Sequence, residues 1–180
     1  VYAGASHTCG IVGDTTVKCW GDNSSGQLGP GEPGPFPAEK AIDTEMPGHV
    51  RSLALGGRHT CALLQSGDVT CWGNNESGQL GRACLNCEAP EGFAAAQVTS
   101  PVVNLGDAAT KIVAGANHTC ALLAGGNVRC WGANERLQLG IGEGEQIGDD
   151  ETPASVSARE FAGRPVDIAA GENHTCVLLE

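Results

Sequence analysis

One phrase of nine residues occurs four times along this chain of 180 residues. It begins with glycine, carries His-Thr-Cys at its centre and ends in apolar residues, and its cysteines are Cys9, Cys61, Cys120 and Cys176. Successive cysteines are 52, 59 and 56 residues apart. A period of this size is typical of arrays in which each repeat is one supersecondary unit that buries its apolar face against its neighbours. We therefore expect a repeat array rather than a domain built around one central core.

A second phrase follows the first in three of the copies. It runs from Cys-Trp-Gly through a short polar stretch to Gln-Leu-Gly, and its cysteines are Cys19, Cys71 and Cys130. Each lies ten residues after the first cysteine of its copy, although the period between copies varies. A constant spacing inside a variable period predicts a rigid unit joined by tolerant loops. The fourth copy reaches Glu180 six residues before its second cysteine would occur, so we expect a longer array or an atypical end, with Cys176 unpaired.

Each segment between paired cysteines predicts a β-hairpin. Apolar residues flank a turn that contains glycine in all three copies, and glycine tolerates the positive φ that tight hairpins need. If Cys61 faces Cys71, then Leu63 faces Val69. Directly opposed cysteines on antiparallel strands can reach the Cβ separation of about 4 Å that a disulfide requires. The spacing therefore predicts three disulfides, Cys9–Cys19, Cys61–Cys71 and Cys120–Cys130.

Further short strands complete the predicted unit. One precedes each later hairpin, at residues 50–55, 111–114 and 166–169, and a fourth follows proline at 101–103, 153–156 and, as a weaker match, 37–42. Four strands per unit of about 50 residues predict an all-β fold of four-stranded antiparallel blades, a β-propeller. The glycines argue against helical repeats, and a parallel β-solenoid is the structural alternative. The repeats are expected at about 1–49, 50–109, 110–165 and, incomplete, 166–180.

The composition of the chain indicates which partners it can bind and in which cellular compartment it folds. With 21 acidic and 10 basic residues the net charge is -11, which repels nucleic acid and anionic lipid surfaces. No apolar stretch is long enough for a membrane span. Nine cysteines favour an oxidising compartment, so we expect a secreted, periplasmic or cell-surface protein.

Two sets of residues invite a metal or redox interpretation. His7, His59, His118 and His174 recur at one position of the repeat, which puts them on different blades, so we expect structural histidines bonded to a neighbouring loop rather than a metal site. A Cys-x-x-Cys pair, Cys84 and Cys87, stands in an insert outside the repeat. It could close a loop disulfide, exchange thiols or hold half a metal site; the loop disulfide is favoured, because zinc needs two further ligands.

Acidic residues in the last insert form a third candidate. Glu143, Glu145, Asp149, Asp150 and Glu151 lie in a glycine-rich loop that could bind calcium, but their spacing matches no EF-hand, and a solvated loop is favoured. No nucleophile, base and orienting partner occur as a set. We therefore expect no catalytic residue, no metal and no cofactor.

The two phrases and the proline-led strand together resemble the repeat of the regulator of chromosome condensation family of seven-bladed β-propellers. The likeness covers the chain apart from inserts at 30–44, 82–97 and 141–152, and the paired cysteines are most similar to the bacterial exported branch. In such a ring this chain would supply three blades and part of a fourth. Its open ends would then favour self-association.

The resemblance implies protein binding, since relatives bind proteins and the nuclear founder exchanges nucleotide on the small GTPase Ran. We expect a non-catalytic recognition scaffold whose inserts contact an unknown protein partner. The alternative is a propeller that acts as a guanine nucleotide exchange factor or associates with chromatin. The candidate binding residues are Glu32, Phe36, Glu88, Glu91, Phe93, Glu143, Glu145, Asp149 and Asp150.

Overall fold

The recurring cysteines face one another across antiparallel hairpins. The structure, a computed structural model, describes residues 1–29, 34–35, 41–82, 102–142 and 144–180. Three cysteine pairs lie directly opposite in register, Cys9 and Cys19, Cys61 and Cys71, and Cys120 and Cys130. Their Cα atoms are 4.1, 4.1 and 4.0 Å apart, the close approach of non-hydrogen-bonded pairs, and their sulfur atoms are bonded. The described hairpins thus carry the three disulfides that the spacing predicts.

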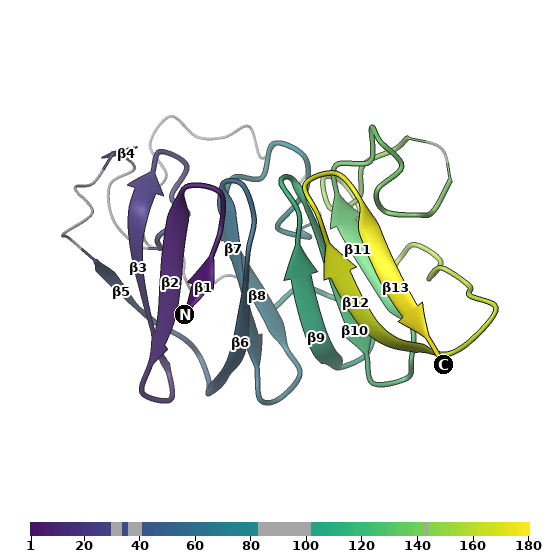
Figure 1. The fold of residues 1–180 in the computed structure, drawn as a ribbon, viewed down its shortest axis with the longest axis horizontal. Helices are drawn as coiled ribbons and strands as arrows, with labels where there is room; N and C mark the ends of the chain where they lie inside the picture. The colour runs from purple at the N-terminus through teal and green to yellow at the C-terminus, as the bar shows by residue number, and fades with distance from the viewer. Residues whose placement is uncertain (30–33, 36–40, 83–101, 143) are drawn as a thin grey trace.

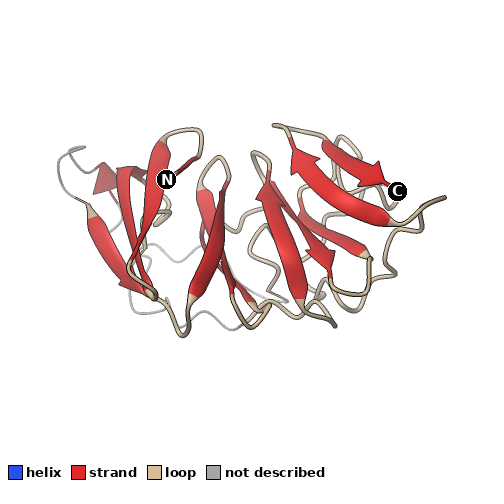
Figure 2. Ribbon diagram, turned by 60° about the horizontal axis from the view of Figure 1, so that its bottom comes forward, coloured by secondary structure: helices blue, strands red, loops and turns tan. Residues whose placement is uncertain are grey.

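The described part of the chain consists of strands, turns and loops, without a helix (Figures 1 and 2). Its antiparallel strands form four sheets, which we call blades 1 to 4. Blade 1 contains β1 (Tyr2–Ala3), β2 (His7–Val12), β3 (Thr16–Asn23), β4 (Gly34–Pro35) and β5 (Ile42–Glu45). Blade 2 contains β6 (Val50–Leu55), β7 (His59–Leu64) and β8 (Val69–Gly73). Blade 3 contains β9 (Ala109–Ala114), β10 (His118–Leu123) and β11 (Val128–Gly132), and blade 4 contains β12 (Pro165–Ala170) and β13 (Thr175–Leu179).

The blades stand side by side in chain order (Figure 1). The first strands of neighbouring blades contact one another: β1 contacts β6, β6 contacts β9, and β9 contacts β12. The blades therefore share an inner edge formed by these strands. Figure 2 shows this fan from a second direction. This is the arrangement of a β-propeller. The predicted first strands at 50–55, 111–114 and 166–169 are confirmed, although β9 and β12 are each two residues longer than predicted.

Burial depends on having a neighbour on both sides. Every residue of β7 and β10 is buried, whereas β13 is mostly exposed. At one repeat position, Leu63 is 0% exposed in blade 2 and Leu178 is 62% exposed in blade 4. The apolar core therefore lies between blades, as expected of a repeat array.

The fourth strand of the blade differs from the prediction. In blade 1, β5 pairs with β3 and starts at Ile42, where the weak prediction ends. In blade 2, the segment from residue 102 onward is irregular, although the Val103 amide donates to the Val69 carbonyl at 2.8 Å. In blade 3, residues 153–156 form a turn, and a single bridge joins Val128 to Arg159 instead. The prediction at 153–156 was wrong, because Pro153 and Ala154 begin a turn rather than an extended run.

The first glycine of the repeated phrase is explained by close packing at the inner edge. A Cβ added to Gly115 would lie 2.1 Å from Cε1 of His118 and 2.6 Å from the carbonyl oxygen of Gly171 in the next blade. A Cβ at Gly56 would likewise lie 2.1 Å from His59 Cε1. Glycine is therefore needed for the histidine ring to lie over the backbone and for blades to approach.

Candidate functional site

Neighbouring blades are joined by polar contacts, and the same contacts recur at each boundary between two blades. We call these boundaries seams, and number them from the one between blades 1 and 2. At the first seam, the backbone oxygen of Gln27 accepts hydrogen bonds from Thr60 Oγ1 at 2.8 Å and Trp72 Nε1 at 3.0 Å. The second seam has the same arrangement, with Gln79 as acceptor and Thr119 and Trp131 as donors, at 3.1 and 2.9 Å. One carbonyl of blade 1 and one of blade 2 thus each receive two donors from the next blade, and these donors are buried.

The histidine of the repeated phrase completes this network. Nε2 of His59 lies 2.9 Å from Thr119 Oγ1, and His7 and His118 make the equivalent contacts with Thr60 at 2.8 Å and Thr175 at 3.0 Å. Because each threonine hydroxyl donates its hydrogen to a carbonyl, its oxygen must accept from the histidine. The proton of each neutral ring is therefore on Nε2. The partner is a threonine in the adjacent blade, rather than the loop that the sequence suggested.

The seam histidines are held in the neutral form. Burial lowers the pKa of His7 to about 4 and that of His118 to about 4. Burial also lowers the pKa of His59 to about 3, with a further contribution from the neighbouring histidines. Nδ1 of all three rings is buried without a hydrogen-bond partner among the described residues, so a second proton would have no acceptor. This arrangement suits a structural contact and not acid–base chemistry near neutral pH.

A turn after each Cys-Trp-Gly phrase aims the glutamine carbonyl at the next blade. In blade 1, Asn23 Oδ1 accepts from the Leu28 amide at 2.9 Å, and Gln27 Oε1 accepts from the Ser25 amide at 2.8 Å. The turn also contains a residue with positive φ, Gly26 at 75°. Gly78 takes this position in blade 2, but Leu137 takes it in blade 3, with φ of 60°.

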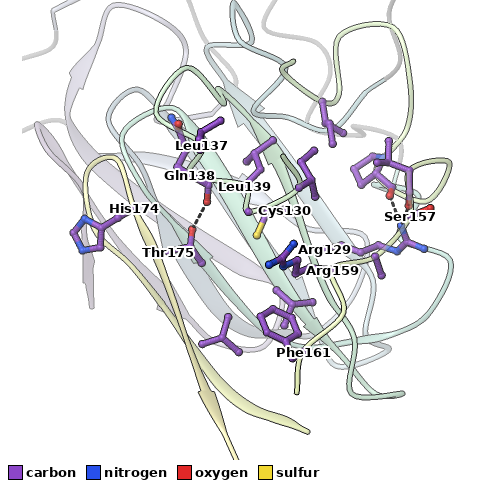
Figure 3. A pocket seen from close by; sticks show the side chains of 18 of the residues that line it. Arg129, Cys130, Leu137, Gln138, Leu139, Ser157, Arg159, Phe161, His174 and Thr175 are labelled. Atoms are coloured by element: carbon purple, nitrogen blue, oxygen red, sulfur yellow. Dashed lines mark hydrogen bonds between the residues drawn. The ribbon is translucent and has the colours of Figure 1, made fainter. Parts of the chain in front are cut away.

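The third seam is open on one side. The Gln138 carbonyl accepts from Thr175 Oγ1 at 2.9 Å, as the dashed line in Figure 3 shows, but no tryptophan of the described residues donates to it. A groove of about 240 Å³ lies beside this contact, and it is lined mainly by β11, the following loop, residues 153–161 and β13. Its volume is below the ~300 Å³ at which pockets for drug-sized ligands begin. Phe161 and Leu139 give the groove apolar walls (Figure 3).

Three carboxylates of the last insert come together. Oxygen atoms of Asp149, Asp150 and Glu151 lie within 4.8 Å of one another. Burial first, and then the hydrogen bond with Asp150 and the negative charges of both aspartates, together raise the pKa of Glu151 to about 7. Asp149 also accepts a hydrogen bond from Gln146 Nε2 at 2.6 Å. The cluster is an exposed to half-buried acidic surface that a cationic group of a partner can approach.

The structure describes only part of the predicted site. Glu145 and Asp150 are exposed and Asp149 is half-buried, all in the loop before residue 153. The remaining candidate residues and the Cys-x-x-Cys pair lie outside the described residues: Glu32, Phe36, Cys84, Cys87, Glu88, Glu91, Phe93 and Glu143. Cys176 is exposed and unpaired in β13.

Sequence reasoning missed the seam network, although its signal was present. Thr60, Gln27 and Trp72 belong to the two repeated phrases, yet their partners belong to different copies. Repetition of a polar residue indicates a repeated contact, but not which blade supplies its partner. Among the described residues, no helix is both long and apolar enough to cross a membrane.

Two family models match the chain, both described as "Regulator of chromosome condensation (RCC1) repeat". One covers residues 66–122 and 125–178, and the other covers 1–27, 50–79 and 109–138. The first alone spans more than half of the chain.

Individual proteins are similar along the same length. The ultraviolet-B receptor UVR8 of Arabidopsis thaliana is 32% identical over 100% of this chain and 39% of its own length, and human Protein RCC2 is 30% identical over 97% and 36%. Yeast RCC1 (Prp20), solved bound to Kap60, has a TM-score of 0.77 at 20% identity, covering 96% of this chain and 40% of that one. The chain thus spans less than half the length of these similar proteins.

Proposed function

Since the chain belongs to the RCC1 repeat family, we propose that it is a secreted or cell-surface scaffold that recognises another protein through the loops between its hairpins. One observation carries this proposal: wherever two blades adjoin, the repeated His and Thr side chains and the Gln carbonyl bond to one another across the boundary, joined by Trp72 and Trp131 in the first two seams. These contacts involve no insert residue, and the inserts hold ten of the 21 acidic residues, so they can vary with the partner while the scaffold is kept.

The relatives support a binding role without specifying a partner. An ultraviolet-B receptor and Protein RCC2 share this repeat at about 30% identity, although their names denote different roles. Proteins that share a fold can have different roles, because function depends on the particular residues that a fold displays at its binding site. The part of the chain that varies most between copies is the inserts, so we propose that they determine the partner.

Export is supported by the three hairpin disulfides, since such bonds persist in oxidising compartments and are rare in the cytosol. Non-reducing peptide mass spectrometry on protein taken directly from its source organism tests this. We expect the three hairpin pairs to be linked. Free thiols at all six positions would exclude the exported assignment.

Loop recognition is tested by neutralising charges in the described insert. The variant carries Glu145→Gln, Asp149→Asn and Asp150→Asn, and a matched control loses three charges elsewhere, through Asp14→Asn, Asp68→Asn and Glu172→Gln. Both are compared with the unaltered chain by crosslinking to extracellular protein. We expect the same partner with the unaltered chain and the control, and its loss with the loop variant at an unchanged melting temperature. Equal capture by both variants would refute loop recognition.

The exchange-factor alternative makes a separate prediction. It requires faster release of a fluorescent guanine nucleotide from Ran when the chain is added in catalytic amount. We expect no acceleration, because the net charge of -11 and the disulfides favour an extracellular partner. A rate that rises with chain concentration would replace the scaffold proposal.

A further inference from the structure

Asn117 is an exposed asparagine in the turn between β9 and β10. With His118 and Thr119 it forms the sequence Asn-x-Thr, which is an acceptor for N-linked glycans. His118 and Thr119 are 0% exposed and take part in the seams. At the position of Asn117, the first two copies carry Ser6 and Arg58. The seams therefore require the histidine and the threonine, but they do not require an asparagine before them.

The turn that carries Asn117 is fixed by its neighbours on both sides. The Gly57 amide donates to the Ala116 carbonyl at 2.9 Å, and the Ala116 amide donates to the Glu172 carbonyl at 2.9 Å. The Asn117 carbonyl accepts from the Ala133 amide at 2.8 Å. These bonds use backbone groups only, and the Asn117 side chain is exposed although blade 3 has a neighbouring blade on each side. A group attached to this side chain would therefore project from a rigid turn into solvent.

Two other acceptor sequences, which begin at Asn23 and Asn75, have a structural explanation. Asn23 is 0% exposed, and its Oδ1 accepts from the Leu28 amide at 2.9 Å in the turn after Cys-Trp-Gly. Asn75 is half-buried and makes the equivalent contact at 2.9 Å. In blade 3, Asn134 keeps this contact, although no serine or threonine follows two residues later. In these turns the asparagine is structural, and a glycan on the buried Asn23 would have no space.

We infer that Asn117 carries an N-linked glycan. This inference rests on the proposed export, because such glycans are found on surface loops of secreted proteins. The donor is an oligosaccharide linked through pyrophosphate to a polyprenol lipid. Nδ2 of Asn117 forms a bond to C1 of the first sugar, the bond from C1 to the pyrophosphate oxygen breaks, and the amide proton leaves with the lipid pyrophosphate. The step involves no oxidation or reduction.

The folded hairpin buries the hydroxyl that belongs to the acceptor sequence. Thr119 Oγ1 donates to the Gln79 carbonyl at 3.1 Å and lies 2.9 Å from Nε2 of His59. The next residue, Cys120, is bonded to Cys130. The glycan must therefore be attached before this hairpin closes and blade 3 packs against blade 2. After folding, the same turn holds the glycan at the surface.

The position of the glycan restricts how a partner can approach. The turn between β9 and β10 lies at the same end of the blades as the loop that follows β11 (Figure 1). N-linked glycans are bulky and hydrophilic. A partner that contacts the insert at 141–152 therefore approaches from the outer side of blade 3 and not across its inner edge.

Peptide mapping of the protein from its source organism tests this inference. Peptides are released without reduction and treated with peptide N-glycosidase in water enriched in heavy oxygen, which converts a glycosylated asparagine to labelled aspartate. We expect the label at Asn117 and none at Asn23 or Asn75. An unlabelled Asn117 together with linked hairpin cysteines would overturn the glycan and leave export standing. An unlabelled Asn117 together with free thiols would overturn both.

Secretion of the 180-residue chain from cultured animal cells separates Asn117 from the other acceptor sequences. Asn117→Gln should lower the mass of the secreted chain by one glycan. Ser25→Ala, the matched control, removes the acceptor sequence of Asn23 and should leave the mass unchanged. Arg58→Asn creates the acceptor sequence at the same position of blade 2 and should add one glycan, with melting temperatures as the check on folding. An Asn117→Gln chain with the mass of the unaltered chain would contradict the assignment.

The required order of attachment and folding is tested with purified chain that carries no glycan. An oligosaccharyltransferase with a lipid-linked donor should modify the reduced, unfolded chain at Asn117 and lose this activity on the folded, disulfide-bonded chain. Equal transfer to both forms would show that the buried hydroxyl of Thr119 is no barrier, and would overturn the order inferred from its burial.

Discussion

Leu137 occupies a backbone conformation that its counterparts fill with glycine. Its φ is 60° and its side chain is 57% exposed, so packing offsets little of the strain. The left-handed region costs an L-residue roughly 1–2 kcal/mol, a cost that glycine does not have. Glycine also raises the conformational entropy of the unfolded chain, which offsets part of this gain. We predict that Leu137→Gly raises the free energy of unfolding by about 0.5–1 kcal/mol in urea titrations.

Leu137→Ala separates backbone strain from the exposed apolar side chain. Alanine keeps the Cβ and therefore the strained conformation, so this variant should not be more stable than the original chain. If alanine stabilised as much as glycine, removal of the leucine side chain and not of strain would be the cause.

His59 should make stability depend on pH. Burial lowers its pKa to about 3, against about 6.5 in the unfolded chain, so the unfolded state binds the proton first as pH falls. The stabilisation is therefore fully present above pH 6.5 and is lost between about pH 6 and the folded-state pKa. Within that window this residue should cost up to about 1.4 kcal/mol per pH unit in free energy of unfolding.

A matched pair of variants isolates this contribution. His59→Gln retains a donor for Thr119 but does not titrate, so its unfolding free energy should fall less steeply between pH 6 and 4. His49→Gln, which changes a mostly exposed histidine outside the seams, is the matched control. Identical slopes for all three proteins would show that the pH dependence arises elsewhere, such as in the carboxylates.

The hairpin of β7 and β8 tests the contribution of the cross-strand disulfide. Closing a loop of ten residues stabilises the folded state by about 2–3 kcal/mol in the chain-entropy model. We predict that the double variant Cys61→Ala and Cys71→Ala loses about that much in urea unfolding. Alanine is small and apolar, so it can replace both cysteines in these buried strands without placing a polar group in the core.

The corresponding change in blade 1, Cys9→Ala with Cys19→Ala, serves as the comparison. Both loops have the same length, so the entropic model predicts similar losses. A much larger loss in blade 2 would mean that packing between two neighbours, rather than the closed loop, determines the effect.

The exposed edge of blade 4 should make the isolated chain associate with itself. We predict that Leu178→Lys lowers the weight-average mass in sedimentation experiments, because a charge on an edge strand opposes pairing with another edge. Val102→Lys, at a similarly exposed apolar residue outside this edge, is the control. Both are made with Cys176→Ser, so that disulfide dimers do not contribute. Equal association of the two variants would exclude this edge.

Much of the fold could be predicted because the repeat is local. The ten-residue cysteine spacing predicted the hairpin and its register, and the runs before each hairpin predicted the first strands. The fourth strand was less predictable, since β5, the segment near Val103 and the bridge at Arg159 differ among blades. Their pairing depends on insert length and on the blade they join, neither of which a short apolar run encodes.

The candidate site was only partly predictable from the chain. The acidic insert was recognisable from composition, but the proximity of Asp149, Asp150 and Glu151 depends on how the loop folds. The groove near Gln138 could not be found in the same way, because its walls come from segments as distant as Val128 and Val177. Only the stacking of blades brings these walls together.

The amino-acid sequence by itself determined the repeat, the hairpins and the cysteine pairing, because these depend on residues that are near one another along the chain. The tertiary structure decided which copy bonds to which. His59 forms a hydrogen bond with Thr119, and both Thr119 and Trp131 donate hydrogen bonds to the Gln79 carbonyl. These partners are 40 to 60 residues apart along the chain. Identical phrases offer every copy the same partners, and only the order of blades in space selects one.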